Sequence, residues 1–327
     1  MNRIEVIDAH TAGEPLRLIV TGVPIPSGST MNEKRAFMKA QFDHYRTALM
    51  LEPRGHADMY GCLLTEPVSP DGDHGVLFLH NEGYSTMCGH GIIALATILL
   101  ESGMTAWQGD EHVFRFDTPA GRITATAYRN SGRVAHVSFE NVPAWVVSTG
   151  HRVEVPDGEF RYDIAFGGAF YAVGPSLHPV TPENGSRLAL LGTGIKQQAS
   201  GHRLNHPEDV AMEFLYGVIF TDRAVSPDAH SRNVCIFADG ELDRSPTGTG
   251  VSARAALHFF AGDIGLGERI RIESILGTSF EVYAKEVTTF GPYPAIVPVV
   301  SGSAFITGTS QFVFAEHDPL QHGFRIR

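Results

Sequence analysis

Two short segments, one in each half of the chain, combine glycines with side chains that can do chemistry. The first covers residues 84–91 (YSTMCGHG) and the second covers residues 243–250 (DRSPTGTG). Each ends in x-Gly-x-Gly and runs into an Ala-rich stretch typical of a helix. Glycine lets the backbone approach a ligand closely, and a helix start presents unpaired N–H groups with the positive end of its dipole. The pair therefore favours a cradle for a carboxylate or phosphate, although a single copy would be explained by helix capping alone.

The side chain that could react is Cys88, which stands at the start of the first of these helices. The dipole and N–H groups there stabilise a thiolate, which is a base or a nucleophile. His90 is only two residues along the same turn, so we expect that it cannot readily reach the sulfur and that it contacts the substrate instead. Helix capping is the simpler alternative for His90. We interpret Cys62 and Cys235, in apolar strand-like runs, as small buried hydrophobic residues.

Asp243 precedes the second helix start by a few residues. A carboxylate there could bind the ammonium group of a substrate whose carboxylate occupies the cradle, and the two contacts together describe an amino acid. An ordinary turn aspartate explains the same residue equally well. The sequence has no zinc-protease helix motif and no phosphate-binding loop of the GxxxxGK type, so we expect no metal, no nucleotide and no cofactor.

The elements that must position these turns are mostly short strands. β-Branched runs bounded by Gly, Pro, Asn and Asp predict strands at residues 3–7, 16–20, 75–80, 123–128 and 233–238. Helical spacing is convincing at residues 31–48, 89–101, 186–198 and 249–260. Cys88 and Thr247 lie 159 residues apart, about half of the 327-residue chain, which favours two similar domains facing each other across one cleft.

Composition excludes several classes of protein. With 43% hydrophobic and 19% charged residues the chain is an ordinary globular protein rather than a disordered one. A net charge of −11 disfavours binding to nucleic acid or to an anionic membrane, and a small-molecule partner fits better. Three cysteines are too few for a disulfide framework, and we see neither a signal peptide nor a membrane-spanning stretch. We therefore expect a cytoplasmic location.

The chain resembles the proline racemase family along nearly its whole length. The matching runs are HTAGEP at residues 10–15, EPRGH at 52–56, MCGH at 87–90, DIAFGG at 163–168, RNV at 232–234, and DRSP with GTG at 243–246 and 248–250. The resemblance implies an α+β fold of two similar domains of the diaminopimelate epimerase type. Each would be a curved β-sheet around a central helix, with the active site in the cleft between them. We expect one domain at residues 1–142, completed by residues 304–327, and the other at residues 143–303.

The resemblance also assigns roles to residues. In the family two thiols face opposite sides of the substrate Cα, and the amides of the two glycine turns hold the carboxylate. Cys88 takes the position of the first thiol. The cradle positions are Gly89, His90, Gly248 and Thr249, the contacts to the substrate nitrogen are Asp243 and His90, and Tyr60 would form a wall of the cleft, with core packing as its simpler role. A homodimer is also implied.

Thr247 departs from the racemase pattern, because racemases and 4-hydroxyproline epimerases have the second cysteine there. A hydroxyl has a pKa far above that of a thiol, so Thr247 cannot cycle protons at neutral pH without a base beside it. The Cys/Thr pair and Ala169 resemble a class of this family, the trans-3-hydroxy-L-proline dehydratases. The implied reaction is dehydration to Δ1-pyrroline-2-carboxylate without a cofactor, with the Cys88 thiolate removing the Cα proton. The alternatives are racemisation of proline, 2-epimerisation of 4-hydroxyproline, and a non-catalytic imino-acid-binding protein.

Overall fold

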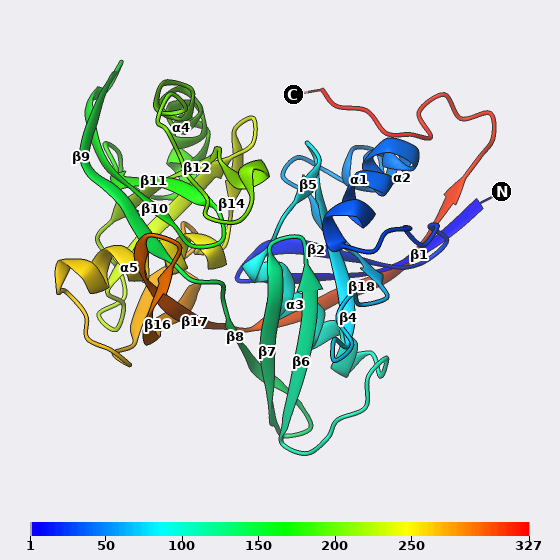
Figure 1. Ribbon diagram of the computed structural model, residues 1–327. Helices are drawn as coiled ribbons and strands as arrows, with labels where there is room; N and C mark the ends of the chain where they lie inside the picture. Colours follow the sequence, from blue (N-terminus) through cyan, green and yellow to red (C-terminus); the bar gives the residue numbers. More distant parts are fainter. Residues whose placement is uncertain (1, 327) are drawn as a thin grey trace. The chain divides into compact units, whose positions relative to one another are not determined.

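The computed structural model describes residues 2–326, and these form two compact units (Figure 1). The first unit comprises residues 2–139 together with 303–326, and the second comprises residues 140–302. Each unit mixes strands and helices, and each is described by itself.

The first unit contains strands β1 to β8, together with β18 from the end of the chain. Its elements are β1 (Asn2–Thr11), β2 (Glu14–Thr21), α1 (Met31–Gln41), α2 (Asp43–Met50), β3 (Tyr60–Thr65), β4 (His74–His80), β5 (Tyr84–Ser85), α3 (Gly89–Glu101), β6 (Glu111–Thr118), β7 (Gly121–Asn130), β8 (Arg133–Glu140) and β18 (Ala304–Phe314). β18 pairs antiparallel with β1, so the end of the chain completes this unit.

The second unit contains the remaining elements in one continuous stretch. These are β9 (Trp145–Val155), β10 (Gly158–Phe166), β11 (Phe170–Pro175), η1 (Pro182–Asn184), α4 (Gly185–Ala199), η2 (Val210–Met212), β12 (Leu215–Asp222), β13 (Ser231–Phe237), β14 (Glu241–Asp243), α5 (Gly248–Ala261), β15 (Ile270–Glu273), β16 (Ser279–Phe290) and β17 (Tyr293–Gly302).

The strand pairings of the two units follow one pattern. In the first unit, β1–β2 is antiparallel, β2–β3 parallel, β3–β4 and β4–β5 antiparallel, β4–β6 parallel and β6–β7 antiparallel. In the second, β10–β11 is antiparallel, β11–β12 parallel, β12–β13 and β13–β14 antiparallel, β13–β15 parallel and β15–β16 antiparallel. The internal repeat inferred from the two glycine turns is therefore a repeat of topology. In each unit the second parallel pair is joined through one helix, α3 or α5, as parallel strands require.

These two helices are the centres of their units. α3 packs against β1, β2, β7 and β18, whereas α5 packs against β9, β10, β11, β16 and β17. Every residue of α3 from Gly89 to Leu100 is buried, and so is every residue of α5 from Gly248 to Ala256. A helix segment that is buried around its whole circumference must be enclosed on all sides, and here strands pack around each helix. The glycine turns therefore begin inside the protein and not at its surface.

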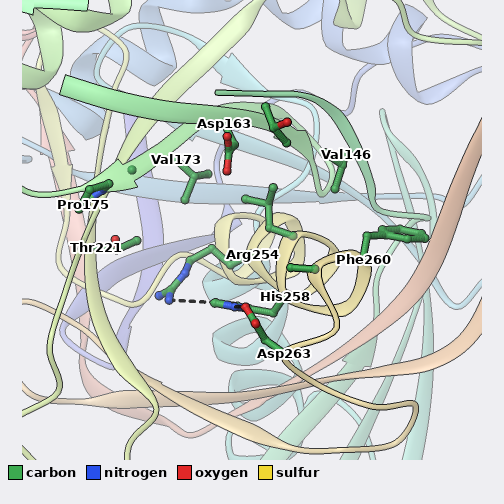
Figure 2. A pocket seen from close by; sticks show the side chains of 13 residues that line it. Val146, Asp163, Val173, Pro175, Thr221, Arg254, His258, Phe260 and Asp263 are labelled. Carbon is green, nitrogen blue, oxygen red and sulfur yellow. Dashed lines mark hydrogen bonds and ion pairs between the residues drawn. The ribbon is translucent and has the colours of Figure 1, made fainter. Parts of the chain in front are cut away.

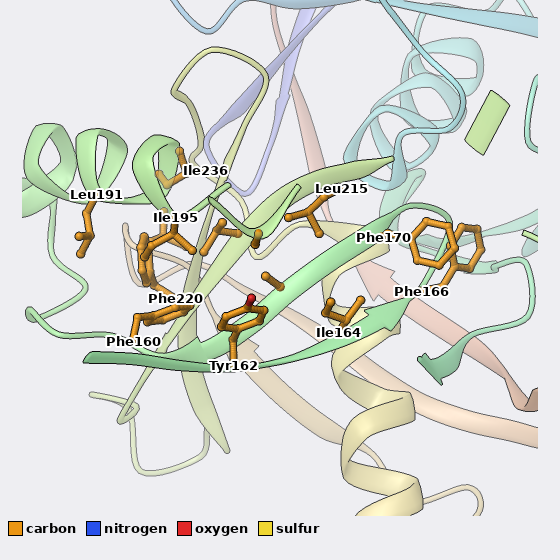
Figure 3. Packing of buried hydrophobic residues seen from close by; sticks show 14 of the residues in the cluster. Phe160, Tyr162, Ile164, Phe166, Phe170, Leu191, Ile195, Leu215, Phe220 and Ile236 are labelled. Carbon is orange, nitrogen blue, oxygen red and sulfur yellow. The ribbon is translucent and has the colours of Figure 1, made fainter. Parts of the chain in front are cut away.

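A second layer of packing supports α5 from the far side of its sheet. Large apolar side chains of β10, β11, β12 and α4 meet in one cluster that includes Phe160, Phe220, Leu191 and Ile195 (Figure 3). Phe160 and Phe220 are fully buried, and their rings meet edge to face with centroids 5.3 Å apart. The cluster holds the strands that carry the second turn.

The single helix expected over residues 31–48 is wrong. The structure has two helices, α1 and α2, because Phe42 adopts φ −134° and ψ 18° and interrupts the helical backbone. Phe42 packs its ring against Phe37 and Tyr45. Arg46 of α2 meanwhile donates to the carbonyl oxygens of His80 and Asn81 at the end of β4. These tertiary contacts override a helical pattern that local sequence alone predicts to be continuous.

Replacement of Phe220 tests the role of the apolar cluster in the second unit. Phe220→Ala removes a fully buried ring and should lower the free energy of unfolding of the second unit by about 3–5 kcal/mol. Val225→Ala, at a side chain that is 75% exposed, should change it by less than about 0.5 kcal/mol. Urea unfolding followed by fluorescence measures both, and equal effects of the two substitutions would contradict this description of the core.

Candidate functional site

The first glycine turn is closed by the thiol of Cys88. Cys88 is the N-cap of α3, with an extended backbone at φ −146° and ψ 109°, and its Sγ accepts a hydrogen bond from the N–H of Gly91 at 3.2 Å. A Cβ at position 91 would lie 2.9 Å from this sulfur and 2.6 Å from the Phe78 ring. Glycine is therefore required there for the sulfur to reach the helix end. An N–H donor and the positive end of the helix both favour the thiolate form.

Our expectation that His90 cannot reach the sulfur is wrong. The Nδ1 atom of His90 lies 3.3 Å from the Cys88 Sγ, and both residues are buried. The reason is the N-cap geometry, which turns the cysteine side chain back over the first turn of α3, where the His90 ring lies. An imidazole nitrogen can accept a proton from a thiol or donate a hydrogen bond to a thiolate. The contact gives the sulfur a proton partner within its own turn.

His90 is held through its backbone and through its ring. Thr11 donates its hydroxyl hydrogen to the His90 carbonyl oxygen at 2.8 Å, which ties the start of α3 to the end of β1. The Tyr60 ring meets the His90 ring edge to face, with centroids 4.8 Å apart, and its hydroxyl is hydrogen-bonded to the Ser85 hydroxyl. Tyr60 is 3% exposed, so within this unit it packs as a buried wall beside the turn.

The second turn is strained at Thr247. This residue is the N-cap of α5 and has φ 67° and ψ 100°, in the positive region that a β-branched side chain very rarely adopts. Such a backbone costs about 1–3 kcal/mol and persists only where its surroundings enforce it. The Thr247 hydroxyl is also buried without a hydrogen-bond partner among the described residues. Strain and an unpaired polar atom at one residue make Thr247 a candidate functional residue.

A set of hydrogen bonds inside the second unit enforces the strained turn. Asp243 Oδ1 accepts from the Ser245 N–H at 2.7 Å, and Ser245 Oγ accepts from the Thr247 N–H at 3.0 Å. Asn233 donates from Nδ2 to the Pro246 carbonyl oxygen at 3.0 Å, and its Oδ1 accepts from Arg254 at 2.8 Å. The residues before Thr247 are thus held by β13 and α5 together.

The start of α5 differs from that of α3 in one respect. Thr247, the N-cap of α5, makes no side-chain capping bond, so its side chain occupies none of the N–H groups of the first turn, and such groups suit an anion. The Thr249 hydroxyl is hydrogen-bonded to the Tyr171 hydroxyl at 2.6 Å. Burial raises the pKa of Tyr171 well above its usual value, so this phenol keeps its proton. Gly248 and Thr249 are buried, as is Asp243.

Asp243 makes the turn contact that the sequence allowed, and its role in substrate binding stays a prediction. Its Oδ1 makes the turn contact to Ser245, while its Oδ2 accepts no hydrogen bond within the described residues.

The thiol of Cys62 differs from that of Cys88, because burial raises the pKa of Cys62 far above the usual value and makes this thiol inert.

Within residues 2–326, His, Cys, Asp and Glu form no group of three or more that could hold a metal ion. None of the helices described there is long and apolar enough to span a membrane.

The chain was compared with family models and with curated proteins. The family model described as proline racemase matches residues 6–325. The chain belongs to the proline racemase family. It is 47% identical over 332 residues to a trans-3-hydroxy-L-proline dehydratase of Colwellia psychrerythraea, covering 99% of this chain and 93% of that protein. It is 40% identical over 329 residues to a 3-hydroxyproline 2-epimerase of Burkholderia multivorans, with 99% and 98% covered.

Solved structures agree with this assignment. A hydroxyproline epimerase from Agrobacterium vitis, solved with bound trans-4-hydroxy-L-proline, superposes with a TM-score of 0.93 at 29% identity, covering 100% of this chain and 95% of that one. A PhzF-family protein of Bacillus anthracis shares the fold at a TM-score of 0.60 and 12% identity, with 96% and 100% covered. The fold of this proline racemase family member is therefore the α+β fold expected from the sequence motifs.

The structure groups the residues that the sequence singled out. Cys88, Gly89, His90 and Tyr60 lie together around the start of α3, and Asp243, Thr247, Gly248 and Thr249 lie together around the start of α5. Their catalytic and binding roles stay predictions. Sequence reasoning missed the supports of the second turn, Asn233, Arg254 and Tyr171. The RNV run was the one available signal for Asn233, and no local pattern indicates the other two.

Thr247→Gly tests whether the second turn is strained. Glycine adopts positive φ without a steric penalty and removes the unpaired hydroxyl, which together outweigh its greater loss of backbone entropy on folding. We expect the free energy of unfolding to rise by about 1 kcal/mol in this family member. Chemical denaturation measures the change.

Cys88→Gly is the matched control, at the same helix position but with a relaxed φ of −146°, and it should destabilise the protein. A loss of stability in Thr247→Gly as large as that in Cys88→Gly would contradict the inference that the backbone is strained at Thr247.

Proposed function

We propose that the protein dehydrates trans-3-hydroxy-L-proline to Δ1-pyrroline-2-carboxylate without a cofactor. The observation that carries this proposal is the residue pair Cys88 and Thr247, a thiol at one glycine turn and a hydroxyl at the other. The relative at 47% identity, itself named as such a dehydratase, supports it. The reaction involves no net oxidation or reduction, so it requires no redox group.

In the proposed first step the Cys88 thiolate removes the Cα proton of the substrate and becomes a thiol. The Gly91 N–H at 3.2 Å and the His90 ring at 3.3 Å support the thiolate before the transfer. His90 then lies close enough to pass the proton from the sulfur toward solvent once the product has left. Removal of a proton from Cα requires that the negative charge formed there be stabilised.

That stabilisation comes from the groups proposed to bind the substrate. N–H groups of the first turns of α3 and α5 bind the carboxylate as it gains enolate character, and one such donor in an oxyanion hole is typically worth about 3 kcal/mol. Asp243, through the free oxygen Oδ2, binds the protonated ring nitrogen, which withdraws charge from Cα. The proposal requires that both turns act on one substrate, as the family resemblance implies.

In the second step the C3–O bond breaks and the hydroxyl leaves as water. The electrons of the Cα–H bond form the Cα–C3 double bond, and the departing hydroxide takes up a proton from water, which balances the proton that Cys88 later releases to solvent through His90. The buried Thr247 hydroxyl, which has no partner among the described residues, is suited to donate a hydrogen bond to this leaving group. The resulting enamine tautomerises to the cyclic imine, so that the substrate loses one water in total.

A second candidate function is 2-epimerisation or racemisation of an imino acid with only one thiol. The relative named 3-hydroxyproline 2-epimerase, at 40% identity, favours it. Water would then have to deliver the proton to the second face of Cα. The high pKa of a threonine hydroxyl makes Thr247 a poor donor for that purpose.

Parallel incubation with three substrates separates the candidates. With trans-3-hydroxy-L-proline we expect a cyclic imine, detected by o-aminobenzaldehyde, whereas trans-4-hydroxy-L-proline and L-proline should give no inverted product by chiral chromatography. Cys88→Ser should lower kcat by at least about 100-fold while preserving substrate binding, because a hydroxyl is a far weaker base than a thiolate. Inversion without imine would establish the second candidate, and binding without any turnover in the native protein would indicate a binding protein.

Thr247→Cys supplies the thiol that this chain lacks. It should introduce racemisation of proline or epimerisation of hydroxyproline at a measurable rate, because a thiol can give a proton to the far face of Cα. Thr247→Ser is the control, since it keeps a hydroxyl and should keep the dehydratase activity. If Thr247→Cys gives no exchange or inversion while folding normally, position 247 does not face Cα.

A further inference from the structure

The middle of α5 carries a buried arginine that the proposed mechanism does not use. Arg254 is 3% exposed, and its Nη1 donates to Asn233 Oδ1 at 2.8 Å. Its Nη2 donates to Ser231 Oγ at 2.6 Å and to His258 Nε2 at 3.4 Å (Figure 2). A buried charge is costly even when it is hydrogen-bonded, and an apolar side chain of similar size would avoid that cost. Packing of the core therefore does not explain why an arginine stands here.

His258 holds the guanidinium of Arg254 from one side. An arginine can only donate, so His258 accepts at Nε2 and carries its proton on Nδ1, which faces Asp263 Oδ2 at 3.1 Å. Burial lowers the pKa of His258, in agreement with a neutral ring. Asp263 therefore orients the imidazole, and the imidazole in turn orients Arg254.

Arg254 also decides which way the amide of Asn233 points. Asn233 is fully buried on β13, and only its oxygen can accept from an arginine. The amide nitrogen must then point the other way, where it donates to the carbonyl oxygen of Pro246 at 3.0 Å. A flipped amide would place its oxygen against that carbonyl oxygen instead. Because Pro246 directly precedes Thr247, Arg254 controls the hydrogen bond that holds the strained turn.

The start of α5 has further supports of its own. The Thr249 hydroxyl is hydrogen-bonded to the Tyr171 hydroxyl at 2.6 Å, and Ser252 Oγ donates to the Gly248 carbonyl oxygen at 2.9 Å. Neither contact involves Arg254. Loss of this arginine should therefore release the residues before the helix while the N–H groups of the first helical turn stay in place.

We propose that Arg254 is a positioning residue that keeps Thr247 in its positive-φ conformation and so aims the Thr247 hydroxyl at the departing C3 oxygen. The inference rests on the proposed dehydration. It assigns Arg254 to cleavage of the C3–O bond and not to removal of the Cα proton. Proton removal depends on Cys88 and on the N–H groups that bind the carboxylate, which Arg254 does not hold.

Two reactions measured on Arg254→Met separate positioning from a general structural role. Methionine is a flexible apolar residue that fills buried space but donates no hydrogen bond. For trans-3-hydroxy-L-proline, kcat for imine formation should fall at least about tenfold while KM changes by less than about twofold. Exchange of the Cα proton of L-proline in D2O should stay within about twofold of the native rate, because it requires no leaving group. Equal losses in the two reactions, or no loss in either, would overturn the proposal.

Arg232→Met is the matched control. Arg232 is also a buried arginine of the second unit, but it pairs with Glu273 at 3.1 Å and donates to the Val180 carbonyl oxygen. It precedes Asn233 on β13, and successive strand residues point to opposite faces of the sheet. Arg232→Met should destabilise the protein without changing the ratio of the two reaction rates. A ratio changed as much as in Arg254→Met would overturn the proposal.

Asn233→Ala breaks the same chain of hydrogen bonds at its next link. It should reproduce the selective loss of imine formation, and it decides the question if Arg254→Met does not fold. Proton exchange that falls as far as imine formation in this variant would count against the proposal.

A stability measurement tests the link to Thr247 without relying on dehydration. Thr247→Gly relieves the strained backbone, so it should lose more than about half of its stabilising effect when Asn233→Ala has already released the turn. Equal effects of Thr247→Gly in the two backgrounds, measured by chemical denaturation, would overturn the proposal. A native protein that forms no imine, with this coupling present, would refute the proposed dehydration and support the positioning of Thr247 by Arg254.

Discussion

The left-handed backbone at Thr247 is the constraint on which the second half of the site depends. A β-branched residue at φ 67° is held by contacts from β13, β14 and α5, all within one unit. The same contacts fix the start of α5 and therefore the direction of its free N–H groups. The packing of the surrounding unit offsets the cost of the strained residue, and the result is a turn with a fixed conformation.

The first turn is also held in one conformation, but by different contacts. Cys88 has a relaxed backbone, and its sulfur caps α3, while a glycine at position 91 leaves room for it. The thiol proposed to react is therefore also the capping group of α3, with His90 beside it. At the second turn the N-cap hydroxyl makes no capping bond at all. One turn thus holds a proton acceptor and the other an unengaged hydroxyl, an asymmetry that suits elimination better than inversion.

The sequence predicts the two turns, the helices that follow them and the internal repeat, because glycine pattern and helical spacing are local signals. It does not predict the strain at Thr247, since threonine is a poor residue for positive φ and the hydrogen bond from Asn233 comes from 13 residues away. It was wrong about His90, because the reach of a side chain depends on the rotamer of the N-cap cysteine. It was wrong about the helix over residues 31–48, because the tertiary contacts of Phe42 and Arg46 favour two shorter helices. Buried Arg254 carries no local signal that separates it from a surface arginine.

Proton chemistry on one face of Cα is the central claim, and deuterium labelling of L-proline tests it most directly. L-Proline has no C3 hydroxyl and cannot lose water, so in D2O it reports only the removal and return of the Cα proton. Exchange of that proton for deuterium with retention of the L configuration, followed by NMR and chiral chromatography, is the result expected from Cys88 acting alone. Formation of deuterated D-proline as fast as deuterium enters L-proline would contradict the claim, because it would require a second acid on the opposite face.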